Sequence, residues 1–326
     1  MIVVGVLVLL AGIGDVCWTA LGLMGGGPLS SLIARSTWAV FKGLPLGSRG
    51  RVVAGPLILL LLVVTWSLLL WLGWFLVFFG GGGVMRASTG VAASASETIY
   101  FTGYCVFTLG NGDYAPTAFP WTLLTSIASG SGLIVITLAI TYFIAVLASV
   151  VEKRALATLL ADLGATPAGI VTAGWNGSNF QPLEQFLPQI ATAVGVYAQH
   201  HLAYPVLHYF HGETLRVSMP VRLAALHDAL LILGEGVAPG AKPHPLFVEP
   251  IRQAIRSFAA VARGEFVGSA AAPPPPDLEP LAQEQIPTVT ADVFKTASIA
   301  DSETRQVLRA LVENDTHQWS DLLVKP

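Results

Sequence analysis

The sequence predicts an all-α membrane protein with three transmembrane helices, a re-entrant helix and loop, and a helical cytoplasmic domain. Only 11% of the 326 residues are charged, whereas a soluble domain carries about 25%. Residues 1–151 contain three acidic and five basic side chains, and residues 152–326 contain 17 and 12. Three apolar segments of the first part are long enough for a bilayer core, which takes about 20 helical residues.

The three apolar segments are residues 2–24, 53–79 and 119–151. The first lacks a basic leader and a cleavage site of small residues and is too long for a signal peptide, so we expect it to be retained. Six basic residues follow the first and third segments: Arg35, Lys42, Arg49, Arg51, Lys153 and Arg154. The positive-inside rule therefore predicts a multi-pass protein of the cell membrane, with the N-terminus outside and the C-terminal domain cytoplasmic.

A short helix is predicted between the second and third apolar segments. Ser94-x-x-Glu97 has the form of a capping box, and the apolar run that it opens ends at Phe107, after about three turns. That run is too short to span the membrane, and Thr108-Leu-Gly-Asn-Gly-Asp113 follows it directly. A short helix and an irregular loop between two spanning helices are typical of a re-entrant pore loop.

Residues 53–151 resemble the pore domain of the potassium-channel superfamily, whose filter reads T-[VIL]-G-[YF]-G-[DN]. The resemblance is to simple members in which two helices and a pore loop from each of four chains form one pore. It implies an outer helix over 53–79, a pore helix over 97–107, a filter over 108–113 and an inner helix over 119–151. Residues 1–52 would then be an additional transmembrane helix with a cytoplasmic loop. The six filter residues are Thr108, Leu109, Gly110, Asn111, Gly112 and Asp113.

In such a filter, backbone carbonyls and the Thr108 hydroxyl replace the water around a cation, and Asp113 forms a ring of charge at the outer mouth. Successive carbonyl groups face one axis only if the backbone alternates between right-handed and left-handed conformations. Gly110 and Gly112 suit the left-handed positions, which need a positive φ. The resemblance implies a homotetramer that conducts K⁺, or Na⁺ as well, and needs no cofactor. An ordinary Gly-Asn turn between two helices is the alternative interpretation.

Asn111 departs from the family pattern, because an aromatic residue is usual at that position. The ring packs behind the filter in potassium-selective members, and Asn111 cannot fill its volume. We expect Asn111 to form a hydrogen bond with Tyr104 or Thr102 of the pore helix. Bacterial relatives with a small polar residue here include non-selective cation channels, so the sequence predicts a potassium channel with a non-selective sodium and potassium channel as the alternative.

The inner helix contains Gly130 and Gly132, and in the family a glycine near this place lets the helix bend and open the gate. Close packing against the pore helix is the other explanation for small residues here. Thr137 and Thr141 lie on one helical stripe that would line the cavity if it faced the pore axis. Hydroxyls bonded back to their own helix are the alternative.

The sequence contains no motif of a voltage sensor or of a nucleotide-binding domain, and one acidic residue lies within a predicted span. No apolar segment has Arg at every third position, as a voltage sensor does, and no G-x-G-x-x-G follows a strand pattern after residue 152. Asp15 is the one ionisable residue within a predicted span, and we expect it to pack helices together. The net charge of −3 and the lack of a Lys/Arg cluster in the second part of the chain argue against a nucleic-acid partner. The partners that we expect are therefore monovalent cations and the lipid bilayer.

The second part of the chain reads as a helical domain over 152–269, followed by a Pro-rich linker and a helical segment over 270–326. Helices are expected to start at Pro167, Pro220 and Pro245, and another is expected over residues 182–203. Asp301 is expected to cap a final helix. Residues 270–276 include four consecutive prolines and predict a stiff extended linker.

Three histidines of the cytoplasmic domain are weak candidates for a metal site. His201, His208 and His211 are spaced by seven and three residues, but Pro205 interrupts the helix that this spacing requires. We therefore predict no metal ligands and no enzyme, and a role in pH sensing stays open. A membrane-anchored metal-dependent enzyme and a non-conducting membrane scaffold are the alternatives of other classes.

Overall fold

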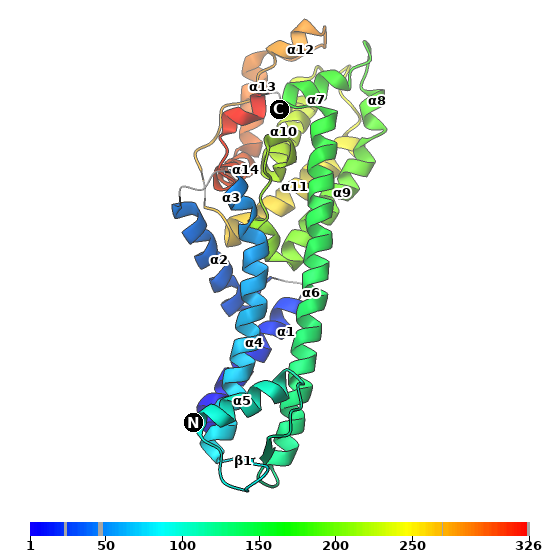
Figure 1. The fold of residues 1–326 in the computed structure, drawn as a ribbon. Coiled ribbons are helices and arrows are strands. Elements are labelled where there is room, and N and C mark those ends of the chain that lie inside the picture. The colour runs from blue at the N-terminus through cyan, green and yellow to red at the C-terminus, as the bar shows by residue number, and fades with distance from the viewer. Residues whose placement is uncertain (23–24, 45–47, 269, 325–326) are drawn as a thin grey trace. The chain divides into compact units, whose positions relative to one another are not determined.

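The structure is a computed structural model that describes residues 1–22, 25–44, 48–268 and 270–324. The chain divides into two compact units (Figure 1). The first consists of Met1–Pro45, Ala54–Leu147 and Ala203–Val206, and the second of Leu46–Val53, Ala148–Leu202 and Leu207–Pro326.

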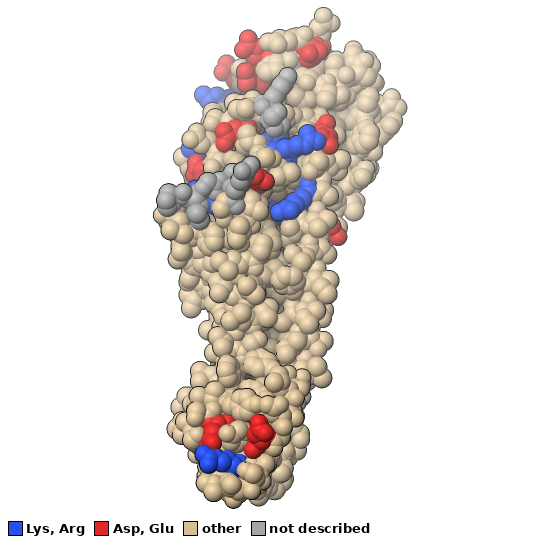
Figure 2. Space-filling model, in the orientation of Figure 1, with Lys and Arg blue, Asp and Glu red and all other residues tan. Residues whose placement is uncertain are grey.

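The first unit contains the three membrane-length helices. These are α1 (Ile2–Leu21), the helical stretch Gly50–Gly81 that includes α4 (Ala54–Gly81), and α6 (Trp121–Leu163), whose last part belongs to the second unit. Between α4 and α6 lie β1 (Val84–Arg86), α5 (Ala95–Val106) and β2 (Tyr114–Pro116), and the two strands pair antiparallel. The prediction of an all-α membrane protein with three spanning helices is thus confirmed in its coarse form. On the face in Figure 2, charged atoms of this unit gather at the end that carries β1.

Several predicted boundaries were wrong. The predicted end of the first helix, residues 23 and 24, lies outside the described residues, and α1 ends at Leu21. The stretch after it is not a plain loop, because Pro28 opens α2 (Pro28–Gly43) and α3 (Ser48–Val52) follows. The inner helix continues twelve residues beyond Val151 to Leu163. Glu152, Lys153 and Arg154 mark a change of polarity there, and charged residues do not end a helix as Pro or Gly would.

Asp15 joins three helices of the first unit. Its carboxylate accepts hydrogen bonds from the Trp66 indole Nε1 of α4 at 3.0 Å and from the Leu29 and Ser30 backbone nitrogens of α2 at 2.9 and 3.3 Å. These backbone N–H groups belong to the first turn of α2, whose donors have no partner inside the helix. The carboxylate of α1 therefore caps α2 and holds α4, which is the helix-packing role that we expected.

The second unit is a bundle around α10 (Met219–Leu231), in which every residue from Val221 to Leu231 is buried. α7, α11 and α14 pack on it. Besides α3 and the last part of α6, it contains α7 (Pro167–Ala173), α8 (Gln181–Glu184), α9 (Leu187–Ala203), α10, α11 (Pro245–Glu265), α12 (Glu279–Gln283), α13 (Ala291–Ser298) and α14 (Ser302–Asn314). Shorter 3₁₀ or π turns cover Pro205–Tyr209, Leu215–Val217, Ile232–Gly236, Ile299–Asp301 and Trp319–Leu323.

Two expectations for the second unit need correction, and the proline segment has partners that the sequence did not predict. The helix predicted over 182–203 is divided into α8 and α9, because Pro188 lies in the first turn of a new helix. Asp301 precedes α14 without a side-chain capping bond. The proline segment is bound to the unit, since the Arg305 guanidinium donates to the carbonyls of Pro273 at 3.1 Å and Pro274 at 2.6 Å.

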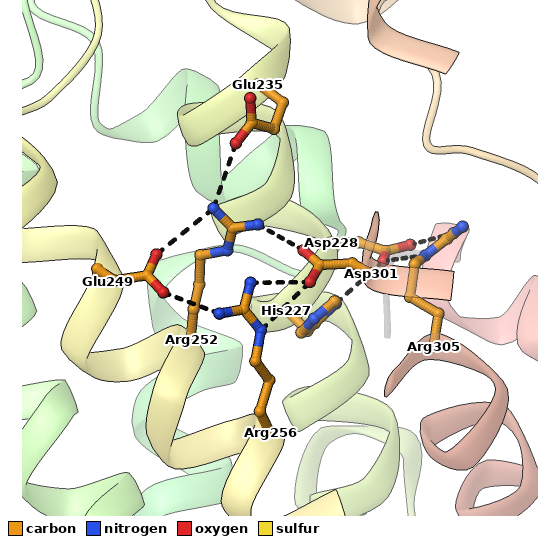
Figure 3. A network of polar contacts seen from close by, with 8 residues as sticks. All are labelled: His227, Asp228, Glu235, Glu249, Arg252, Arg256, Asp301 and Arg305. Carbon is orange, nitrogen blue, oxygen red and sulfur yellow. Dashed lines mark hydrogen bonds and ion pairs between the residues drawn. The ribbon is translucent and has the colours of Figure 1, made fainter. Parts of the chain in front are cut away.

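Ion pairs join α10 to α14, and α11 to the Ile299–Asp301 turn that directly precedes α14 (Figure 3). Asp228 of α10 accepts two hydrogen bonds from Arg305 of α14, at 2.8 and 3.0 Å. Asp301 accepts from Arg252 at 2.6 Å and from Arg256 at 2.9 Å, both on α11. Asp301 is used in this network instead of capping a helix. Charged groups this deeply buried need such partners, because desolvation disfavours an unpaired ion.

Candidate functional site around the loop between α5 and α6

The capping box that begins α5 is present as predicted. The Ser94 hydroxyl accepts from the Glu97 backbone nitrogen at 3.4 Å, and the Glu97 carboxylate accepts from the Ser94 backbone nitrogen at 2.8 Å. Two donors of the first turn are thereby satisfied. α5 is a helix of 12 residues that begins and ends between the two membrane-length helices α4 and α6.

Indole donors hold α4 against α5 and α6. Trp71 Nε1 of α4 donates to the Ile99 carbonyl of α5 at 3.0 Å, and Trp74 Nε1 donates to the Ser131 hydroxyl of α6 at 3.0 Å. α6 approaches the end of α5 at Gly132, where an added Cβ would lie 1.9 Å from the Val106 carbonyl oxygen. Gly132 is therefore a close-packing residue, whereas a Cβ at Gly130 would meet no atom within 4 Å. Of the two predicted hinge glycines, only Gly130 is sterically free for that role.

The backbone φ angles after α5 alternate between positive and negative values. Thr108, Gly110 and Gly112 have φ values of 59°, 66° and 80°, and Leu109, Asn111 and Asp113 between and after them do not have a positive φ. The positive φ that we required at the two glycines is present. Thr108 adds a third such position, which costs free energy in a residue with a Cβ and which nothing in the sequence indicated. The alternation means that this segment is not a single Gly-Asn turn.

Asn111 has a different partner from the two that we expected. Its side-chain nitrogen Nδ2 donates to the Tyr100 hydroxyl of α5. The Tyr104 hydroxyl instead donates to the Tyr114 carbonyl, and the Thr102 hydroxyl donates to the Thr98 carbonyl within α5 at 2.8 Å. Tyr100 lies one helical turn before Tyr104, on the same face of α5. That i, i+4 spacing is the signal in the sequence that makes Tyr100 a candidate partner beside Tyr104.

Two further tyrosines and an ion pair surround this contact. The Tyr100 ring lies edge-on to the rings of Tyr104 and Tyr114, with centroids 5.5 and 6.0 Å apart. The Tyr114 hydroxyl donates to Glu97 Oε1 at 3.2 Å, and Arg86 Nε donates to the same oxygen at 2.7 Å. The bonds from the Ser94 backbone and from Arg86 lower the pKa of Glu97 to about 2, so this carboxylate stays ionised at neutral pH.

The six predicted filter residues are exposed in the single chain, and Leu109 is 67% exposed. Three of them, Thr108, Gly110 and Gly112, border a groove of about 590 Å³ that residues of α5, β2 and α6 also line. α6 contributes Thr125, Ser126, Ser129 and Gly130 to its wall. The groove thus combines hydroxyl groups with the backbone of the loop.

The two predicted cavity threonines of α6 bond to their own helix. The Thr137 hydroxyl donates to the Leu133 carbonyl at 2.8 Å, and the Thr141 hydroxyl donates to the Thr137 carbonyl at 2.9 Å. Both residues are exposed on the unit. Their hydroxyl oxygens keep a free acceptor site after donating, so the contacts are compatible with a cavity-lining role, which stays a prediction.

The histidines of the second unit lie together but are held by other groups. The ring centroids of His201 and His208 are 5.7 Å apart, and those of His208 and His211 are 6.5 Å apart. His208 contacts the Asn314 amide, and His211 pairs with Asp315. Within residues 1–22, 25–44, 48–268 and 270–324, no group of three or more His, Cys, Asp or Glu is arranged to hold a metal ion.

His201 is buried among aromatic rings and near a cation. Burial, and then the charge of Lys153, lower its pKa to about 3, so the ring is neutral at physiological pH. Lys153 itself donates to the backbone carbonyls of Leu207 at 3.0 Å and Phe210 at 2.8 Å. His201 and Lys153 are therefore packed, buried groups of the second unit and not an open site.

The fold and its three membrane-length helices define an integral membrane protein. No family model matches the chain, and no solved structure matches it. It is 34% identical over 323 residues to the "Uncharacterized membrane protein YdjJ" of Bacillus subtilis (strain 168), in an alignment that covers 98% of this chain and 94% of that protein. The chain belongs to the family of that membrane protein.

Proposed function

We propose that this protein is the pore-forming subunit of a tetrameric cation channel that conducts K⁺ through a filter over residues 108–113. The single observation that supports this most strongly is the alternating backbone at Thr108, Gly110 and Gly112. It follows a capped 12-residue helix and precedes a membrane-length helix. An ordinary connection between two helices does not need three residues of positive φ at every second position.

The chemistry of this segment suits a dehydrated cation. A backbone that alternates in hand can turn successive carbonyl oxygens toward one side, where they replace the ion's hydration shell. The C-terminal end of α5 directly precedes the segment and carries a partial negative charge, which also favours a cation. Asp113 is exposed beyond the last glycine and supplies a full negative charge.

The stoichiometry follows from the single filter segment in each chain. A ring of carbonyls with fourfold symmetry needs four copies, as in other closed homo-oligomers. The open groove beside the segment and the exposed Leu109 side chain are surfaces that neighbouring copies would cover. Asn111 keeps the non-selective sodium and potassium channel as the second candidate, because no ring from the filter itself stands behind the carbonyls.

The direct test is ion flux through purified full-length protein in liposomes, with the reversal potential measured between potassium and sodium solutions. Gly110→Ala should abolish flux, because a Cβ at φ 66° strains the filter. Gly90→Ala is the matched control, since Gly90 has φ 67° and an added Cβ would likewise meet no atom within 4 Å. Gly90→Ala should keep the wild-type flux.

Two outcomes overturn the proposal. If wild-type protein gives no flux, or if Gly110→Ala retains it, residues 108–113 are not a filter. Native mass spectrometry of the wild type should give a tetramer. A stable dimer or trimer as the sole species is incompatible with one filter segment in each chain.

A further inference from the structure

We propose that the second unit binds a small organic cation with an apolar ring, in a pocket beside the proline segment 270–276. The pocket has a volume of about 360 Å³. Four parts of the chain line it: the start of α7, α10 with the turn that follows it, residues 274–280, and the turn Trp319–Leu323. All of them belong to the second unit, so the pocket does not depend on the proposed filter. Its volume lies in the range of sites for small molecules.

The proline segment gives the pocket a wall that is fixed in place. The ring of each proline restricts its backbone φ, and the run Pro274–Pro276 lines the pocket. Arg305 of α14 holds the segment through the carbonyls of Pro273 at 3.1 Å and Pro274 at 2.6 Å. Proline has no backbone N–H group, so these residues supply apolar pyrrolidine rings and no backbone donor.

Trp319 adds an aromatic ring to the pocket. The guanidinium carbon Cζ of Arg305 lies 5.6 Å from the centroid of the Trp319 ring. A cation–π contact of this kind favours one orientation of the indole. Ile232 and Leu322 add aliphatic side chains to the same pocket, and both are buried. The pocket therefore offers a flat apolar ligand a preformed surface of aromatic, aliphatic and pyrrolidine groups.

The charges that line the pocket are negative. Asp228 and Asp277 both line it, and none of its described lining residues is Lys, Arg or His. Asp228 is buried and accepts two hydrogen bonds from Arg305, at 2.8 and 3.0 Å, which balance its charge (Figure 3). Asp277 is exposed, and its Oδ1 accepts from the Glu279 backbone nitrogen at 2.9 Å. A neutral N–H donor does not balance a carboxylate, so Asp277 leaves the pocket with a net negative charge.

These features define the ligand by its chemistry. A protonated amine or an amidinium group can donate charge-assisted hydrogen bonds to the Asp277 carboxylate. A ring joined to that group can then pack against Trp319 and the prolines. The Thr166 hydroxyl, which accepts from the Gly169 backbone nitrogen at 3.0 Å, keeps its own hydrogen for an acceptor on the ligand. An anion with the same ring would meet the carboxylates and should bind poorly.

Isothermal titration calorimetry of the full-length protein in mild detergent tests this, with tryptamine as the probe. Indoleacetate is the matched anion, because it carries a carboxylate on the same indole ring where tryptamine carries an ammonium group. A ligand of this size reaches a Kd of about 1 mM or below when it fits its site, and we expect this of tryptamine. Indoleacetate should bind at least about tenfold more weakly. The proposal is overturned if tryptamine shows no binding up to about 10 mM, or if both probes bind equally.

Two variants test where the probe binds. Asp277→Asn keeps a side-chain oxygen for the Glu279 nitrogen and removes the charge, so the Kd for tryptamine should rise about tenfold. Trp319→Leu removes the aromatic ring and should also weaken binding. Asp292→Asn is the control, because Asp292 is exposed on α13 and does not line the pocket.

The helical circular dichroism signal shows whether each variant is folded. A wild-type Kd in folded Asp277→Asn or in folded Trp319→Leu overturns the proposal, and if one of the two fails to fold, the other still decides. Because binding is measured without ion flux, this result is independent of the proposed channel function.

Discussion

Asp301 should be among the most important charged residues for the stability of the second unit, although it lies far from the proposed filter in sequence. It is 1% exposed and accepts hydrogen bonds from Arg252 at 2.6 Å and Arg256 at 2.9 Å. Asp301→Ala leaves both guanidinium groups without this acceptor. Arg252 is itself buried, at 8% exposure, so water cannot replace the lost carboxylate there.

The size of the effect follows from what each arginine retains. Breaking a buried ion pair from one side costs about 3–5 kcal/mol. Arg256 keeps Glu249 at 2.8 Å, and Arg252 keeps the longer contacts with Glu235 at 3.4 Å and Glu249 at 3.6 Å. These remaining contacts place the expected loss near the lower limit, about 3 kcal/mol. A domain of this size loses about 2–4 °C per kcal/mol, so the unfolding midpoint should fall by about 6–12 °C.

The assay is thermal unfolding of the full-length protein in mild detergent, followed by the helical circular dichroism signal. Glu303→Ala is the matched control, because Glu303 pairs with Arg263 on the surface, where the side chains are 71% and 42% exposed. An exposed pair contributes at most about 1 kcal/mol. Equal midpoints for Asp301→Ala and Glu303→Ala would refute the argument that burial makes the Asp301 contacts important.

The pH dependence of the unfolding midpoint can be compared between the wild type and Asp301→Ala. Burial raises the pKa of Asp301, but the bond from Arg252, the nearby His227 and the bond from Arg256 lower it more, and the resulting pKa is below the usual 3.8. A carboxylate with a depressed folded pKa stabilises the protein above its unfolded pKa and loses that contribution as the pH falls through the folded value. The difference in midpoint between wild type and Asp301→Ala should therefore be constant near neutrality and shrink below about pH 4.

Two further predictions concern the first unit. Gly132→Ala should prevent normal packing of α5 on α6, because its Cβ would lie 1.9 Å from the Val106 carbonyl oxygen. Gly130→Ala is the control, because an added Cβ there meets no atom within 4 Å. The resistance of the protein to trypsin in detergent should drop for Gly132→Ala, and equal resistance of both variants would contradict the close contact. Asp15→Ala should lower the unfolding midpoint, because it leaves the Trp66 indole and two backbone donors of α2 without their acceptor, at about 1–3 kcal/mol for each buried group. Asp113→Ala removes an exposed carboxylate and should leave the midpoint unchanged.

The sequence by itself determined the membrane class, the existence of the three long helices and the start of α5. Each of these depends on local chemistry. Apolar length defines a spanning helix, and the box of Ser94 and Glu97 begins α5 through contacts only three residues apart. The positive φ values of Gly110 and Gly112 were likewise expected before the structure, from the resemblance to a channel filter and the backbone conformation that such a filter needs.

Tertiary structure decided which side chains meet. Asn111 bonds Tyr100, whereas the spacing in the sequence makes Tyr100 and Tyr104 equal candidates and does not choose between them. Asp301 looked like a helix cap because capping is local, but two arginines of α11, distant in sequence, bind it instead. Asp15 was visible as a buried charge, yet its partners Trp66 and the first turn of α2 depend on how the helices pack. Contacts between distant segments depend on packing geometry, which local sequence patterns do not contain.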